Sequence, residues 1–190
     1  MRRRLAYTGG MATPSSPRAA RPVRSVPLDL ASTDDRSFRF LIDYWQSKQR
    51  GGKLPGRTVI DPAELKRVLP QLLLIDVQRE PLDFRYRLAG TLTYDIFGFD
   101  LTGRRVRDIP PADWGETVWR SLAELVEARK PQYVRLDFTT TDGNVCSYRV
   151  LRLPLAEDGV TVDCVLVMGD FGLHPREFRA DLDAAFGAPK

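Results

Sequence analysis

One arginine within a predicted strand is the clearest candidate for binding chemistry. Alternation along residues 145–155 puts Arg152 on the same strand face as Tyr148 and Val150. If that face is buried, the guanidinium must pair with an acid or bind an anion. A β-bulge near Leu151 would instead turn Arg152 to solvent and place three alternating leucines inside. We favour the bulge, because three leucines are a stronger signal for a buried face than one arginine is against it.

Aromatic side chains with a polar tip supply the other candidates for a pocket, since each combines an apolar ring with one hydrogen-bonding atom. Each of these residues is also an ordinary component of a protein core, so the pocket is a hypothesis about where a small ligand binds. The candidate pocket consists of Tyr86, Tyr94, Trp119, Tyr148 and Arg152.

The sequence offers little for catalysis. Its single histidine, His174, follows the last predicted strand, so a serine or cysteine nucleophile would lack a nearby base. The glycine-containing run 98–103 ends in Arg104 rather than in the Lys-Ser or Lys-Thr of a phosphate-binding loop. We therefore predict that the protein is not an enzyme, and a small enzyme is the third of three hypotheses.

Metal and disulfide chemistry are also disfavoured. The two cysteines, Cys146 and Cys164, and one histidine give no four-ligand set for zinc. If residues 157–159 form the turn of the last hairpin, the cysteines lie about six residues apart along the ladder, or roughly 20 Å. That separation is too great for a disulfide, and we expect two reduced core residues.

Positive charge is concentrated at the N-terminus. Residues 1–27 hold six arginines and no acid, whereas the rest of the chain holds 23 basic and 25 acidic groups. A nucleic-acid-binding domain carries its positive charge on the fold, so we do not expect a nucleic-acid partner. Residues 1–33 lack periodicity and contain four prolines, and we predict a disordered basic tail in which Met11 is an alternative start. No apolar run approaches the roughly 20 residues of a membrane span, which predicts a cytoplasmic location.

An amphipathic helix is predicted from about Asp35 to Arg50, because N-capping residues precede it and two glycines follow it. Its apolar stripe has the spacing i, i+3, i+4, i+7. Phe40 and Tyr44 extend the apolar surface to a second side. That second side either forms a dimer contact or covers the same domain, and both alternatives remain open. The stripe, and candidate dimer interface, is Phe38, Leu41, Ile42 and Trp45.

The remaining pattern predicts an α+β domain. We expect a short helix, two strands, a helical connection, a long helix, three strands and a C-terminal tail with a short helix. Such an order gives a five-stranded antiparallel sheet with helices on one face. In chain order, the short helix is expected at about 61–69, the two strands at 71–77 and 83–89, and the helical connection at 91–108. The long helix is expected at 111–129, the three strands at 133–141, 145–155 and 160–171, and the tail at 172–190.

Several short strings of the sequence carry a resemblance to a known family. They are FRFLIDYW (38–45), GGKLP (51–55), DP (61–62), LP (69–70), FRYRLAGT (84–91) and FGFDLTGR (97–104). Together they resemble a family of small bacterial stand-alone PAS-like proteins. The element order is also that of PAS domains, and the resemblance covers about residues 36–171. It places the domain at residues 34–171, with a flanking helix at 34–50.

This resemblance implies a cup-shaped sheet whose inner face encloses a small molecule. PAS domains bind haem, flavin, organic acids or nothing, and commonly dimerise through a helix before the sheet, so we expect a homodimer. Haem is disfavoured because His174 lies beyond the last strand. Photoactive flavin is disfavoured because such domains carry a reactive cysteine in the helical belt, where this chain has none.

Two hypotheses follow from the resemblance. In the first, the chain is a sensory or regulatory module that binds a small polar or apolar ligand and signals to a partner protein. In the second, it is a ligand-free scaffold that acts only by dimerisation. They differ in whether the interior of the cup is open or filled.

Overall fold

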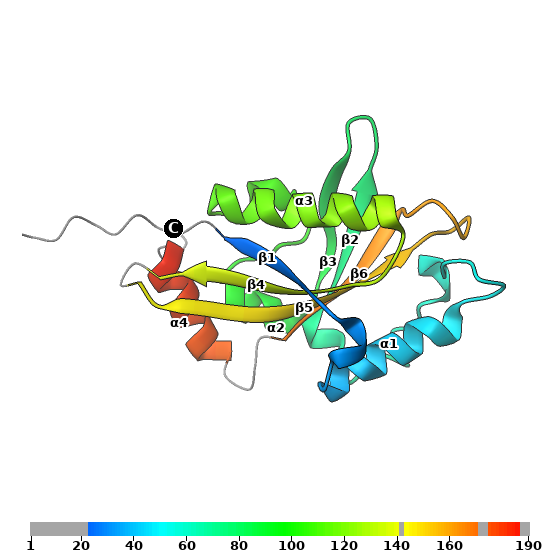
Figure 1. Cartoon of the computed structure of the whole chain (residues 1–190), viewed down its shortest axis with the longest axis horizontal. Helices are drawn as coiled ribbons and strands as arrows, with labels where there is room; N and C mark the ends of the chain where they lie inside the picture. The colour runs from blue at the N-terminus through cyan, green and yellow to red at the C-terminus, as the bar shows by residue number, and fades with distance from the viewer. Residues whose placement is uncertain (1–22, 141–142, 171–174, 187–190) are drawn as a thin grey trace, which may run out of the picture.

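A six-stranded antiparallel sheet is the centre of the structure, a computed structural model that describes residues 23–140, 143–170 and 175–186 (Figure 1). The order across the sheet is β1-β4-β5-β6-β2-β3. The α+β class is confirmed, with one strand more than expected. The strands are β1 (Arg24–Leu28), β2 (Leu72–Gln78), β3 (Asp83–Ala89), β4 (Gln132–Thr139), β5 (Val145–Leu155) and β6 (Cys164–Asp170).

Helices cover both faces of this sheet. On one face, α3 and α2 enclose a core with the inward side chains of β2 to β6, and α4 packs on α2 (Figure 1). On the other face, α1 encloses a second, smaller core. Short 3-10 turns at Leu30–Ser32, Arg57–Val59, Leu69–Gln71 and Val106–Asp108 lie in the connections. The α-helices are α1 (Arg36–Lys48), α2 (Thr91–Phe97), α3 (Ala112–Ala128) and α4 (Pro175–Phe186).

The extra strand β1 corrects the prediction of disorder over residues 1–33. Residues 24–28 pair with β4 from Arg24 opposite Asp137 to Leu28 opposite Tyr133. None of the five residues of β1 is fully buried. Because no face of the strand is buried, its sequence shows no strong alternation of apolar and polar residues. The strand forms because the edge of β4 offers unpaired backbone groups, which is a tertiary effect. The rest of the predicted tail, residues 1–22, lies outside the described residues.

The helix predicted over residues 61–69 is wrong. The segment forms successive turns, in which the Leu65 and Val68 amides donate to carbonyls three residues earlier. The Asp61 carboxylate accepts a hydrogen bond from the Ala63 amide at 2.8 Å. Leu65 and Val68 are the buried residues of this stretch, so its apolar stripe is too short to hold a regular helix against the core.

The register predicted for the last hairpin is also wrong. Leu155 pairs with Cys164 and Arg152 with Val167, so the connection runs from residue 156 to 163 instead of turning at 157–159. Two carboxylates hold this longer loop: Asp158 accepts from two following amides, and Asp163 accepts from the Glu157 amide at 2.7 Å. Neither Cys146 nor Cys164 forms a disulfide within the described residues, and burial raises the pKa of the Cys164 thiol to about 12.

The stripe assigned to a candidate dimer interface is buried within this chain. Asp35 caps α1 by accepting from the Ser37 and Phe38 amides. Phe38, Leu41, Ile42 and Trp45 are each at most 9% exposed and pack against the sheet. The Trp45 indole N–H donates to the Pro154 carbonyl of β5 at 2.9 Å. This stripe of α1 therefore covers its own domain, while Phe40, on the second side of the helix, is only half-buried.

Gly90, between β3 and α2, gives a prediction about the fold. A Cβ atom there would lie 2.4 Å from the Leu69 carbonyl oxygen and 2.5 Å from that of Pro70. Because both contacts are backbone atoms, Gly90→Ala should lower the free energy of unfolding by about 3 kcal/mol, at the upper end for overpacking. Urea denaturation measures this loss.

Gly103→Ala is the matched control. Gly103 has a positive φ of 81° but no atom within 4 Å of the added carbon, so only backbone strain of about 1–2 kcal/mol is expected. An equal or smaller loss for Gly90→Ala than for Gly103→Ala would contradict the predicted clash.

Candidate functional site

A small cavity lies inside the core between the sheet and the helices α2 and α3. Its volume is about 30 Å³, and most of its wall is apolar. Three polar side chains also line it: Tyr86 of β3, Tyr148 of β5 and Arg152 of β5. The volume gives room for about two or three water molecules. It is far below the roughly 300–1,000 Å³ of pockets that hold larger ligands, so a haem or flavin does not fit.

Arg152 points into this core because β5 is buried on both faces. The pairing of β5 with β4 and β6 runs without a register shift, so the favoured bulge is absent. Tyr148 and Val150 therefore share the inner face with Arg152. Leu151, Leu153 and Leu155 lie on the opposite face, under α1. The prediction failed because it assumed that only one face could be buried.

The Arg152 guanidinium is 2% exposed and only partly satisfied. Its Nη1 donates to the Ser121 hydroxyl at 2.5 Å and to the Gln132 amide oxygen at 3.4 Å. The Nε and Nη2 groups donate to no acceptor among the described residues. Arg152 forms no ion pair in that part of the chain, and the Glu124 carboxylate acts on its charge only at longer range. A buried cation without a counter-ion is costly, which makes this site unusual.

Burial determines the protonation of the polar groups in the cavity. It lowers the pKa of Arg152, and the nearby Tyr148 and Tyr86 partly oppose this shift. Burial raises the pKa of Tyr86 to about 12, and raises that of Tyr148 well above the usual value. Trp114 of α3 stacks on Tyr148 with the ring centres 5.4 Å apart. Both phenols are therefore protonated near neutral pH, and the site presents hydrogen-bond donors rather than a base.

The raised pKa of Tyr86 predicts how stability depends on alkaline pH. The pKa is raised only in the folded state, where burial disfavours the phenolate. The free energy of unfolding is therefore unaffected by Tyr86 ionisation below pH 10, and it falls as the pH rises from 10 towards 12, because the unfolded chain loses this proton first. Over that window we expect the free energy of unfolding to fall by about 2–3 kcal/mol from this group. Denaturation at pH 9, 10, 11 and 12 measures the fall.

Tyr86→Phe removes the ionisable group and should reduce that fall by the same amount. The control is Tyr94→Phe at an exposed position, which should leave the pH profile unchanged. If wild type and Tyr86→Phe lose stability in parallel between pH 10 and pH 12, burial of the Tyr86 phenol is not the cause.

The structure brings together three of the five residues proposed for the pocket. Tyr86, Tyr148 and Arg152 line the cavity. Tyr94 is 56% exposed on α2 and lies outside it. Trp119 packs edge-on against Phe84 and beneath Arg107, and it too is outside the cavity wall.

Sequence reasoning missed Ser121 and Gln132, the two acceptors for Arg152. Ser121 lies on the apolar stripe of α3, three residues after Val118 and four before Leu125. A small polar residue at such a buried position was a usable signal. Gln132 gave no such signal, because its position opposite Arg152 depends on how β4 pairs with β5.

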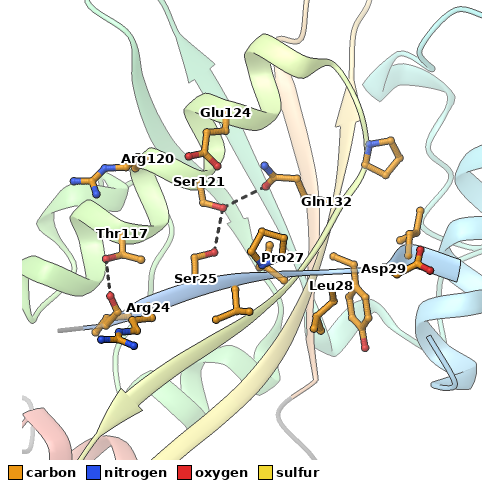
Figure 2. Close-up of a pocket in the computed structure, with 16 residues that line it drawn as sticks. Arg24, Ser25, Pro27, Leu28, Asp29, Thr117, Arg120, Ser121, Glu124 and Gln132 are labelled. Carbon is orange, nitrogen blue, oxygen red and sulfur yellow. Dashed lines mark hydrogen bonds between the residues drawn. The ribbon is translucent and has the colours of Figure 1, made fainter. Parts of the chain in front are cut away.

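A larger groove lies outside this cavity, between β1, α3 and β4 (Figure 2). Its volume is about 660 Å³, and Ser121 and Gln132 are part of its wall. Long hydrogen bonds join β1 to α3 here. The Ser25 hydroxyl contacts that of Ser121 at 3.4 Å, and Thr117 donates to the Val23 carbonyl at 3.3 Å. Figure 2 shows Ser121 between Ser25 and Gln132.

Within the described ranges, no three or more His, Cys, Asp or Glu side chains are grouped so that they could hold a metal ion. None of the helices in those ranges combines the length and the apolar character that crossing a bilayer requires.

Comparison with known proteins identifies the family. The pattern of the PAS domain family matches residues 33–168, which is well over half of the chain. A search of curated proteins gives no match. Among solved structures, an RNA-binding Light-Oxygen-Voltage receptor is 18% identical, with a TM-score of 0.44, and the match covers 86% of this chain.

The chain spans 42% of the length of that receptor. The PAS domain of a protein from Colwellia psychrerythraea is 9% identical, with a TM-score of 0.39, over 57% of this chain and 95% of that one. The family match confirms the resemblance found in the sequence. This chain belongs to the PAS domain family.

Proposed function

We propose that this chain is a PAS-type regulatory module that binds a small anion at Arg152 and signals to a partner protein. Family membership supports a sensory or regulatory module in general terms. The observation that carries the anion is the buried Arg152 guanidinium, which has no ion pair in the described part of the chain.

An anion satisfies this site better than water does. Water can accept hydrogen bonds from Nε and Nη2, but the positive charge stays uncompensated in a low-dielectric core. A carboxylate offers two acceptor oxygens and a full negative charge, and it matches the fork of N–H groups on a guanidinium. The protonated Tyr86 and Tyr148 side chains line the same cavity and add donors for the anion.

The cavity also limits the size of the bound group. About 30 Å³ corresponds to two or three water molecules, which is comparable to the three heavy atoms of a carboxylate. The same small volume favours a second candidate function, a ligand-free scaffold with a filled core. The two differ in what Arg152 does: in the scaffold it is a purely structural residue solvated by trapped water.

Thermal unfolding with added anions tests the proposal. Wild type and Arg152→Met are compared in sodium formate, acetate and chloride at constant ionic strength. A ligand that binds only the folded state raises stability by about 2.7 kcal/mol at one hundred times its dissociation constant. We expect a saturable rise with formate or acetate in wild type and none in Arg152→Met. Equal responses of the two proteins would instead support the scaffold.

A further inference from the structure

We propose that the groove between β1 and α3 is the entrance to Arg152, and that it holds the chain of an elongated carboxylic acid whose head group binds in the cavity. The proposal rests on the anion binding proposed above. It adds the route by which the ligand reaches the buried Arg152 side chain, and the chemical class of the ligand.

A single layer of side chains separates the groove from the cation. Ser121 and Gln132 line the groove, and the same two side chains accept the hydrogen bonds of Arg152 Nη1. The guanidinium also lines the inner cavity. Arg152 therefore contacts both spaces at once, the cavity directly and the groove through its two acceptors. No other layer of the fold has to move for a ligand in the groove to reach it.

The hydrogen bonds within this layer are mostly weak. Ser121 to Gln132, Ser25 to Ser121 and Arg152 to Gln132 are each 3.4 Å, well beyond the usual distance. The contact from Arg152 to Ser121 is the short one, at 2.5 Å. A carboxylate oxygen that replaces the Ser121 hydroxyl exchanges a neutral acceptor for a charged one, and such bonds are about twice as strong. Rotation of the Ser121 side chain is thus the step that admits the ligand.

The volumes of the cavity and the groove indicate which part of the ligand each would hold. The cavity accepts a carboxylate head and little more, whereas about 660 Å³ in the groove lies within the range of small-molecule sites. Apolar groups such as Pro27 and Val134 alternate there with polar ones. Arg120 and Glu124 contribute opposite charges to the same wall. A wall without net charge fits an uncharged chain, so the predicted ligand is a linear carboxylic acid with an uncharged tail.

Calorimetric titration with formate, acetate, butyrate and hexanoate tests this division. If the tail lies in the groove, affinity should rise along the series, by about fourfold for each methylene that becomes fully buried. Pro27→Trp fills the groove from β1, and it should lower hexanoate affinity about tenfold or more relative to formate affinity, because only hexanoate needs the groove for its tail. Glu124→Trp is a second blocking variant from α3, should Pro27→Trp fold poorly.

Val145→Trp is the matched control, because it adds the same side chain at an exposed position outside the groove. It should leave the whole series unchanged. Two results would contradict binding of the tail in the groove and leave anion binding at Arg152 intact. One is formate binding with no gain in affinity along the series, and the other is hexanoate binding that neither blocking variant weakens. Absence of binding by every acid would overturn both proposals.

Discussion

Arg152→Met is expected to abolish anion binding and yet to preserve or raise the stability of the fold. Methionine replaces the aliphatic stem of Arg152 with a flexible, unbranched apolar side chain that carries no charge. Replacing a buried, poorly compensated charge by an apolar group of similar volume is often stabilising, here by about 1–4 kcal/mol. Ser121 and Gln132 retain their hydrogen bond to each other in the variant. Chemical denaturation without added anion measures the gain.

The same variant should bind formate or acetate at least about a hundredfold more weakly, because one charge-assisted pair contributes about 3 kcal/mol. Arg149→Met is the control on the same strand. Arg149 is paired with Asp170 near the surface, so its loss should cost about 1 kcal/mol or less and leave anion binding intact. Destabilisation of Arg152→Met by several kcal/mol would mean that the cation is already compensated in the folded protein.

Trp45→Ala is expected to lower the free energy of unfolding by about 3–5 kcal/mol, as for other large-to-small changes of buried aromatic residues. The side chain is 4% exposed and fixes α1 to the sheet. Its loss also removes the partner of the Pro154 carbonyl. Urea denaturation measures stability, and light scattering on the same samples measures mass.

Phe40→Ala is the control on the same helix. Phe40 is half-buried beneath Arg67, so its loss should cost about 1 kcal/mol. A dimer that used the Trp45 stripe would give a different result: Trp45→Ala would reduce the mass while the stability of the single chain changed little. That outcome would contradict the role of α1 described here.

Elements with a clear internal period were predictable. The bounds of β3 and β5 agree with the predicted ranges 83–89 and 145–155, and α3 begins and ends within one residue of its predicted range. Strand β1 was not predictable, since its five residues are ordered by pairing with β4. The connection after β5 was missed because the carboxylates of Asp158 and Asp163 set its length through contacts that no local pattern encodes.

The site shows a similar limit. Simple alternation put Tyr148 and Arg152 on one strand face, as observed, but the favoured bulge was wrong because burial of that face could not be decided from β5 alone. Leu151 and Leu153 pack under α1, which the sequence treated as a separate flanking helix. Tyr94 was included for its residue type, yet on the short helix α2 it faces solvent. Long-range packing, rather than residue chemistry, decided each of these outcomes.

Strand β1 has a practical consequence for handling the protein. The family match begins at residue 33, so a shortened chain cut at that boundary would lack residues 24–28. The backbone groups of β4 that β1 now pairs would then face solvent along Tyr133 to Asp137. An open strand edge of this kind is a template for pairing between molecules. Pairing by the five residues of β1 thus protects the β4 edge against self-association. A truncation that removes the residues before 33 would promote aggregation.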